Sequence, residues 1–289
     1  MSERIAVDVG GRQLSLSNLD KVLYPDGFTK GQVLDYYTRI APVLLPHLAD
    51  RPLTLKRWPN GVQGHSFFEK NAPSHRPEWL RTERLASPGS IKARETIDYA
   101  VVDSLAALVW VANLATLELH TPMWRIGDQG SDLVVFDLDP GPGTSIVECC
   151  RVALLLRPLI EAAGLAPLAK TSGSKGLQLY ARAQMLDTSG YTKRLAQQLE
   201  QEHPDLVVHR MAKDLRGGKV LVDWSQNSPA KTTVSVYSLR AKSSPTVSTP
   251  VTWAEVETCR ATDDLVFSSD DVLARVAVGG DLFAPLLAP

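Results

Sequence analysis

The sequence predicts an α+β fold in which helices pack on mixed or antiparallel sheets. Apolar runs of strand length and helical patterns both occur, but without the strict strand–helix–strand alternation of a parallel sheet. The chain has 289 residues, of which 44% are hydrophobic, so it can bury a sizeable core in one large domain or two lobes. The charged fraction of 22% is ordinary for a globular protein.

The first part of the chain combines a hairpin, two helices and several strands. Residues 5–9 and 13–16, joined through Gly10-Gly11, form the hairpin. Thr29 and Gln32 have capping-box spacing ahead of a helix that runs to about Leu48. The remaining expected elements are strands at 52–58, 66–70, 96–102 and 117–121, and an apolar helix over 105–114 that is capped by Asp103.

The second part continues the same mixture. Thr144 opens a long predicted helix that reaches about Ala163 and ends at Gly164. Short helical turns are expected near 253–256 and 270–276. The other expected elements are strands at 133–138, 177–181, 220–224 and 232–236, and a helix at 191–202.

Charge and cysteine content narrow the functional classes. The net charge is −1, so any surface that binds nucleic acid has to be a local positive patch whose charge is balanced by acidic regions elsewhere. The three cysteines include no Cys-x-x-Cys pair, which indicates neither a disulfide framework nor a zinc site. Cys149 and Cys150 are expected to be buried thiols, as fits a reducing cytosol. The N-terminus has no hydrophobic signal region, and no apolar run reaches the roughly 20 residues of a membrane span.

Asp137 and Asp139 form the most informative motif, because they end the apolar run that begins at Leu133. Residues i and i+2 of a strand point to the same face, so the two carboxylates leave the strand side by side. Two anions so close repel unless a cation lies between them. Hard oxygen donors favour Mg²⁺ or Mn²⁺. The alternative is a pair of solvated aspartates at an Asp-Pro-Gly turn.

Residues 170–180 contain a second polar motif between two apolar runs. Ser172, Ser174 and Lys175 alternate there with Gly173 and Gly176. Glycines let backbone N–H groups approach an anion, and the hydroxyl and ammonium groups add donors and charge. This composition is typical of phosphate binding, although the Walker spacing is absent. A flexible hairpin turn is the alternative.

Asp223 ends a third apolar strand and is followed by polar residues 225–227. A lone aspartate at a strand end is usually a cap or turn residue. Together with Asp137 and Asp139, it could complete a two-ion site that binds the attacking and leaving oxygens of a phosphoryl transfer.

With these motifs in this order, the chain resembles the archaeo-eukaryotic primase superfamily, and within it the polymerase domain of bacterial ligase D and its stand-alone relatives. The likeness covers nearly the whole chain. It rests on eight strings: Phe136-Asp-Leu-Asp-Pro-Gly141, Thr171-Ser-Gly-Ser-Lys-Gly-Leu177, Val222-Asp-Trp-Ser-Gln-Asn227, Leu19-Asp-Lys-Val-Leu-Tyr-Pro25, Lys56-Arg-Trp-Pro-Asn-Gly61, Phe67-Phe-Glu-Lys70, Leu117-Glu-Leu-His120 and Tyr237-Ser-Leu-Arg240.

The resemblance implies a two-lobed primase-polymerase core over 1–289. Residues 1–125 would supply the DNA-end-binding part, and 126–289 most of the metal and nucleotide site. Asp137, Asp139 and Asp223 would bind two Mn²⁺ or Mg²⁺ ions. The implied nucleotide contacts are Lys56, His120, Ser172, Lys175, Gln178, Arg216, Gln226 and Arg240.

The resemblance also implies DNA contacts. Lys21 and Lys30 would bind the 5′-phosphate at a gap or break, and Phe67 and Phe68 would stack on the template. The two lysines could instead be solvated charges beside a helix. Alternation along a strand predicts that at least one of the two phenylalanines is in the core.

Two of the implied nucleotide contacts have a structural alternative, and a third departs from the family pattern. His120 could be a structural histidine, and Arg216 could lie in a turn beside Gly217-Gly218. Gln178 departs from the family pattern, which usually has His there. Glutamine keeps a hydrogen-bond donor but no charge, so triphosphate affinity is expected to be weaker.

The implied activity is template-directed extension of a primer 3′-OH with NTPs or dNTPs at gaps and double-strand breaks, with ribonucleotides preferred. A metal-dependent nuclease and a non-catalytic DNA-end-binding module are the alternatives. Expected partners are gapped or broken DNA, preferably 5′-phosphorylated, with Ku and a DNA ligase as candidate proteins. The expected location is the bacterial cytoplasm, associated with the nucleoid, and no membrane contact is expected.

Overall fold

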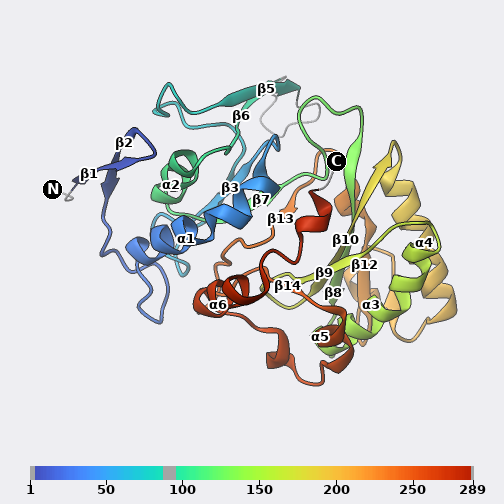
Figure 1. The fold of residues 1–289 in the computed structure, drawn as a ribbon. Helices are drawn as coiled ribbons and strands as arrows, with labels where there is room; N and C mark the ends of the chain where they lie inside the picture. The colour runs from blue at the N-terminus through green and yellow to red at the C-terminus, as the bar shows by residue number, and fades with distance from the viewer. Residues whose placement is uncertain (1–3, 87–95, 288–289) are drawn as a thin grey trace. The chain divides into compact units, whose positions relative to one another are not determined.

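The computed structural model describes residues 4–86 and 96–287 (Figure 1). The chain divides into two compact units, each built from three separate segments. The first unit comprises residues 1–121, 237–246 and 268–280, and the second comprises residues 122–236, 247–267 and 281–289. Helices and mainly antiparallel strands occur in both, which confirms the predicted α+β class.

The first unit pairs its strands antiparallel. β1 (Arg4–Val9) and β2 (Arg12–Ser17) form the predicted hairpin, and β5 (Thr82–Ala86) pairs with β6 (Thr96–Ala100). A third group has the order β7 (Thr116–Thr121), β3 (Thr54–Arg57) and β4 (Phe67–Glu69). The helices of this unit are α1 (Lys30–Leu48), α2 (Leu105–Asn113) and α6 (Ser269–Gly279).

Helix α1 is fixed at its start and along its buried face. Thr29 and Gln32 form the predicted capping box, which satisfies two backbone N–H groups at the helix start. Two buried tyrosines hold distant segments to this helix. The Tyr36 hydroxyl donates to the carbonyl of Tyr237 at 2.8 Å, and the Tyr37 hydroxyl donates to the carbonyl of Leu117 at 2.6 Å. Helix α1 also packs against α2 (Figure 1).

The second unit is built on a six-stranded sheet. Its order is β11 (Val207–Val208), β12 (Val220–Asp223), β8 (Ser131–Pro140), β10 (Leu177–Met185), β9 (Leu168–Thr171) and β14 (Pro250–Val251). Only β11 and β12 are parallel among these pairs of described strands. The short strand β13 (Thr233–Val234) also lies in this unit, and its helices are α3 (Ile146–Glu161), α4 (Thr188–Glu202) and α5 (Trp253–Thr258).

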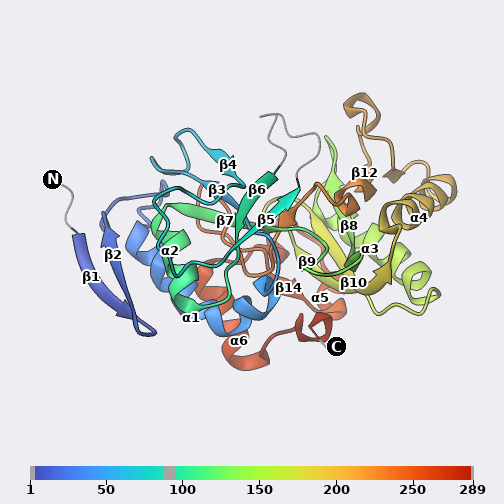
Figure 2. The ribbon, with the colours of Figure 1, turned by 90° about the horizontal axis from the view of Figure 1, so that it is seen from above.

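The two faces of this sheet differ in chemistry. Val134, Phe136 and Leu138 of β8 join the apolar core formed with α3 and α4, which lie beside the sheet in Figures 1 and 2. Because side chains alternate along a strand, Asp137 and Asp139 point to the other face. The apolar face therefore fixes the orientation of the polar one, since a one-residue slip would bury both carboxylates in the core.

Besides α3, which is capped by Ser145 and not opened by Thr144, the predicted cap of α2 and the predicted start of α4 differ from the structure. Helix α2 is capped by Ser104, whose hydroxyl accepts from the Ala107 backbone N–H at 3.4 Å, so the prediction of Asp103 as the cap is wrong. Helix α4 begins at Thr188 and not at 191, because the Asp187 carboxylate accepts from the backbone N–H of Gly190. In both cases, the residue whose side chain reaches a free N–H of the first turn sets the start. No helix in the part of the chain that the structure describes is long and apolar enough to span a membrane.

Candidate metal and nucleotide site

Three aspartates from two neighbouring strands meet on the polar face of the second unit's sheet. Asp137 and Asp139 lie on β8, and Asp223 at the end of β12 is the register partner of Asp137. One carboxylate oxygen of each residue lies within 4.8 Å of those of the other two. The antiparallel register thus brings together Asp137 and Asp223, which are 86 positions apart in the sequence.

The electrostatics of this triad favour a cation. The pKa of Asp137 is raised to about 7 by burial first and then by the neighbouring charges of Asp139 and Asp223, against a hydrogen bond from Gln178. Carboxylates whose mutual repulsion is this strong gain the most from a divalent ion between them. The donor set, three hard carboxylate oxygens, fits Mg²⁺ or Mn²⁺. The residues therefore fit a divalent metal site, which the sequence predicted.

Neighbouring side chains donate hydrogen bonds to the carboxylates of Asp223 and Asp137. Asp223 accepts from the Ser225 hydroxyl at 2.6 Å and from the Gln226 side-chain amide at 2.8 Å. Asp137 accepts from the Gln178 amide at 2.9 Å. Both glutamines were predicted as nucleotide contacts, and the structure places each of them directly on a carboxylate of the triad. Their contact with a nucleotide stays a prediction.

The glycine-rich loop lies between β9 and β10 and against β8. The Ser172 hydroxyl accepts from the backbone N–H groups of Ser174 and Gly176, at 3.2 and 3.1 Å. A Cβ on Gly176 would lie 2.3 Å from the carbonyl oxygen of Leu138, between the two aspartates of β8. Only glycine permits this approach. Because Gly176 lies against Leu138, the glycine-rich loop and the triad belong to one site. Lys175 of this loop is exposed.

Arg216 belongs to the same region of the second unit. A Cβ on Gly141, just after β8, would lie 1.9 Å from the Arg216 carbonyl oxygen, so the two backbones are in close contact. The Arg216 guanidinium donates from Nη2 to the carbonyl of Met211 at 2.5 Å. Its Nε is buried and has no hydrogen-bond partner among the described residues. The Arg216 carbonyl accepts from the backbone N–H of Lys219 at 3.1 Å, so the residue lies at a turn, and its contact with a nucleotide stays a prediction.

The first unit holds a second cluster, centred on the buried Glu118. Glu118 accepts from His120 Nε2 at 2.9 Å and from Arg240 Nε at 3.1 Å, and Lys56 Nζ lies 3.7 Å away. Burial alone would raise its pKa. The hydrogen bond from His120 and the nearby charges of Arg240 and Lys56 hold it well below the usual range. Lys56, His120 and Arg240 were predicted from the sequence, and Glu118, which joins them, was missed. It lies within the string Leu117-Glu-Leu-His120, but two of its partners, Lys56 and Arg240, are remote in sequence.

Lys21 and Lys30 lie close together in the first unit. Lys30 is only 4% exposed and donates to the carbonyl of Ser17 at 2.6 Å, so it is not the solvated charge that the alternative reading proposed. Burial first, and then the charges of Lys21 and Arg57, lower its pKa to about 8. Lys21 donates to the Asn60 side chain at 3.1 Å. Arg57 adds a third positive charge, which sequence analysis missed because an arginine within a strand carries no distinguishing signal.

The expectation that at least one of Phe67 and Phe68 is in the core is wrong. They are 37% and 57% exposed. Strand β4 is three residues long, and each ring packs on a cation of β3. The Arg57 guanidinium lies 5.3 Å from the Phe67 ring, and the Lys56 ammonium lies 5.0 Å from the Phe68 ring. Two exposed aromatic rings remain available for stacking.

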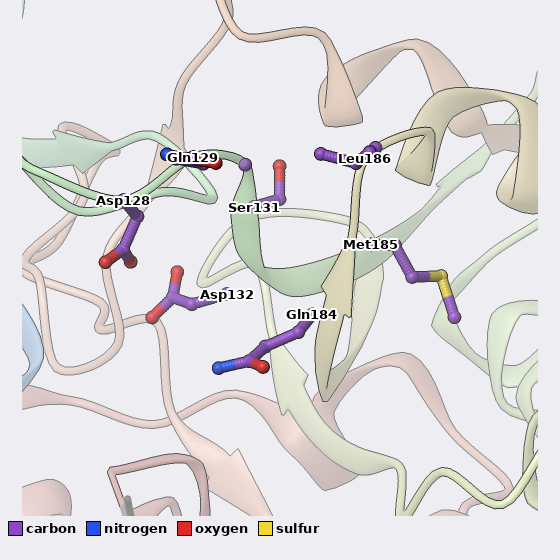
Figure 3. Close-up of a pocket in the computed structure, with 8 residues that line it drawn as sticks. Asp128, Gln129, Ser131, Asp132, Gln184, Met185 and Leu186 are labelled. Atoms are coloured by element: carbon purple, nitrogen blue, oxygen red, sulfur yellow. The ribbon is translucent and has the colours of Figure 1, made fainter.

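The second unit also contains a hollow of about 290 Å³ at the Ser131 end of β8, opposite the aspartate end (Figure 3). Asp128, Asp132 and Gln184 line it, and Asp132 is paired with Arg125 at 3.0 Å. It contains none of the residues predicted from the sequence.

Comparison with known proteins identifies the family. The family model described as "LigD, primase-polymerase domain" matches residues 29–283. The chain belongs to this family. It is therefore a primase-polymerase, a nucleotidyltransferase, and the predicted resemblance is confirmed. Polymerases of this family depend on divalent metal, which agrees with the acidic triad.

Several relatives of the LigD family are similar over most of the chain. The multifunctional non-homologous end joining protein LigD of Mycolicibacterium smegmatis is 47% identical over 95% of the chain and 36% of the relative. The bifunctional LigD of Bacillus subtilis is 28% identical over 93% of the chain and 43% of the relative. The chain thus spans well under half the length of these relatives. A solved structure, the polymerase domain of Mycobacterium tuberculosis ligase D in complex with DNA, matches with a TM-score of 0.87 and 43% identity, over 96% of this chain and 99% of that one.

Proposed function

We propose that this chain extends primer 3′-OH ends with nucleoside triphosphates, under the direction of a template, at gaps and double-strand breaks during non-homologous end joining. The observation that carries the proposal is the triad of Asp137, Asp139 and Asp223, whose oxygens lie within 4.8 Å of one another beside a glycine-rich basic loop. The curated relatives are named for end joining, and the similar solved structure contains DNA.

The triad holds two divalent ions, Mn²⁺ or Mg²⁺, in this proposal. When bound, such ions lower the pKa of the attacking hydroxyl and neutralise the leaving pyrophosphate. The role of the protein is to hold the carboxylates in place and to align the substrates. Phosphoryl transfer depends mainly on positioning and charge neutralisation, so no covalent nucleophile is required.

The nucleotide contacts are proposed from charge and exposure. Lys175 and Arg216 supply cationic donors for the triphosphate, and Ser172 orders the loop that presents Lys175. Gln178 and Gln226 are proposed to reach the nucleotide while they bind the aspartates. In the first unit, the proposed nucleotide contacts are Lys56, His120 and Arg240, with ribonucleotides as preferred substrates.

The DNA contacts are proposed in the first unit. Lys21 and Lys30 are proposed to form a site for a 5′-phosphate, because each is a cation that donates to a neutral oxygen of the protein; the nearby Arg57 is already paired with Glu69 at 2.6 Å. Phe67 and Phe68 stack on the template. Ku and a DNA ligase are the proposed protein partners, and the proposed location is the nucleoid of the bacterial cytoplasm.

A primer-extension gel on labelled gapped DNA tests the proposal. With Mn²⁺ and NTPs, a polymerase gives longer products, a nuclease gives shorter ones, and a binding module gives only a mobility shift. Parallel lanes with dNTPs test the preference for ribonucleotides. A native gel with and without a 5′-phosphate on the gap tests the role of Lys21 and Lys30. Absence of longer products under all these conditions would overturn the proposal.

A further inference from the structure

Lys170 on β9 is a buried cation beside the metal site. It is 1% exposed. Its ammonium group donates to the Ser248 hydroxyl at 2.7 Å, to the carbonyl of Val234 at 3.1 Å and to the side-chain oxygen of Gln178. Burying a charge costs free energy that must be recovered through its contacts, so a buried lysine at this position calls for an explanation.

Gln178 connects this cation to Asp137. Its oxygen accepts from Lys170, and its nitrogen donates to Asp137 Oδ1 at 2.9 Å. All three residues belong to the second unit, and the strand register explains their contact, because Gln178 on β10 is the partner of Lys170 on β9 and of Asp137 on β8.

The charges at its two ends determine how the Gln178 amide is oriented. If the amide were turned over, its NH₂ group would face the ammonium of Lys170, and its oxygen would face the carboxylate of Asp137. Both contacts would be repulsive, since an ammonium group can only donate and an ionised carboxylate can only accept. Lys170 therefore keeps the Gln178 donor directed at the carboxylate.

We propose that Lys170 and Gln178 form a positioning relay that orients the Asp137 carboxylate for divalent-metal binding, although neither residue need touch the metal. The proposal rests on the proposed function only in that the triad binds a divalent cation. It differs from the prediction that Gln178 contacts the nucleotide, because the relay affects metal affinity when no nucleotide is present. Partners that orient a metal ligand are typically worth about 10- to 100-fold in metal affinity.

Mn²⁺ binding without DNA or nucleotide tests the relay, measured by the electron paramagnetic resonance signal of free Mn²⁺. Gln178→Leu keeps the approximate size of the side chain and removes the donor, so we expect Mn²⁺ affinity to fall about 10- to 100-fold. Gln184→Leu is the matched control, since it replaces an exposed glutamine of the same strand, and its Mn²⁺ affinity should equal that of the parent protein. Normal affinity in Gln178→Leu would overturn the relay.

A double-mutant cycle tests the part played by Lys170. Lys170→Met should lower Mn²⁺ affinity in the parent and have little further effect in the Gln178→Leu background, because the two residues act through one contact. Full additivity would overturn the relay. If Lys170→Met does not fold, Gln178→Asn replaces it. The asparagine side chain is one carbon shorter and cannot reach both Lys170 and Asp137. The Gln178→Asn protein should therefore bind Mn²⁺ as weakly as Gln178→Leu does, and an affinity equal to that of the parent would overturn the relay.

The relay and the proposed function can fail separately. If the parent binds Mn²⁺ and Gln178→Leu binds it more weakly, the relay stands even when no primer is extended. If the parent extends primers but Gln178→Leu has parental Mn²⁺ affinity, the relay is wrong and the polymerase function stands.

Discussion

Glu118 in the first unit and Asp137 in the second are both carboxylates on β-strands and are largely withdrawn from water, yet their acidities move in opposite directions. Glu118 has His120, Arg240 and Lys56 as neighbours, and its pKa lies well below the usual range despite burial. Burial and the charges of Asp139 and Asp223 raise the pKa of Asp137 to about 7. Burial acts in the same direction on both, so the sign of the neighbouring charges decides the outcome.

This difference separates a structural anion from a ligand. Glu118 is already neutralised by cations of the protein, so it orders Arg240 and His120 and has no need of an ion from solution. Asp137 has two anions close by, and the Lys170 charge reaches it through an intervening amide. A cation from solution therefore gains more free energy at the triad than at Glu118.

The largest expected effect comes from removing one anion of the triad. Asp139→Ala should lower primer extension at least about 100-fold, because losing a metal ligand costs more than losing a residue that orients one. DNA affinity should change little, as measured by a native gel on the same gapped substrate. Substantial extension by Asp139→Ala would contradict the assignment of the triad.

Removal of Glu118 should affect folding before it affects chemistry. Glu118→Ala leaves its cationic partners without their anion, so we expect the free energy of unfolding to fall by about 3 kcal/mol, the usual cost of breaking a buried ion pair. Urea denaturation measures this change. Glu69→Ala is the control, since Glu69 also pairs with an arginine but has 23% of its side chain exposed, compared with 2% for Glu118. Equal losses in the two variants would contradict the structural role of Glu118.

The pH dependence of stability separates the two carboxylates. Asp137 has a folded pKa of about 7, above its unfolded value, so the metal-free folded protein takes up a proton and gains stability as pH falls through 7. Glu118 has a lowered folded pKa, so its contribution is present above its unfolded pKa and is lost only in more acidic solution. Between pH 5 and 8, Asp137 should therefore change stability and Glu118 should not.

Thermal unfolding in EDTA over that pH window measures this contribution. The melting temperature of the parent, relative to that of Asp137→Asn, should rise as pH falls from 8 to 5. If the two proteins have parallel pH profiles, the raised pKa of Asp137 is refuted.

The smallest expected effect concerns Lys30, a buried cation near other cations. Its pKa of about 8 means that its charge is complete below that pH and is lost as pH rises above it. The part of DNA affinity that depends on the 5′-phosphate should therefore decrease between pH 7 and 9.5. Fluorescence anisotropy on gaps with and without the phosphate measures it. Lys30→Arg stays charged throughout this range and should remove the decrease. A parent protein with no such decrease would exclude Lys30 as the phosphate contact.

The sequence predicted what depends on local pattern. Period-two alternation placed Asp137 and Asp139 on one face of a strand, and capping chemistry set the start of α1. Contacts between remote segments were out of its reach. Glu118 acquires its role from Lys56 and Arg240, and the family strings name these residues without saying which of them touch. The chemistry of Gln178 is also non-local, because only the register of three strands places it between Lys170 and Asp137.

The interleaved course of the chain has a consequence for its synthesis on the ribosome. The first unit includes residues 237–246, so the segment 1–121 emerges more than 100 residues before this part of its own core. Until then, Tyr36 has no carbonyl of residue 237 to bind, and Tyr37 has no Ser238 beside it. Contacts across about 200 positions also form slowly, because a long loop must close first. The nascent first unit is therefore incomplete until this segment has been made, and a stop codon between the two segments would leave the Tyr36 hydroxyl without this acceptor.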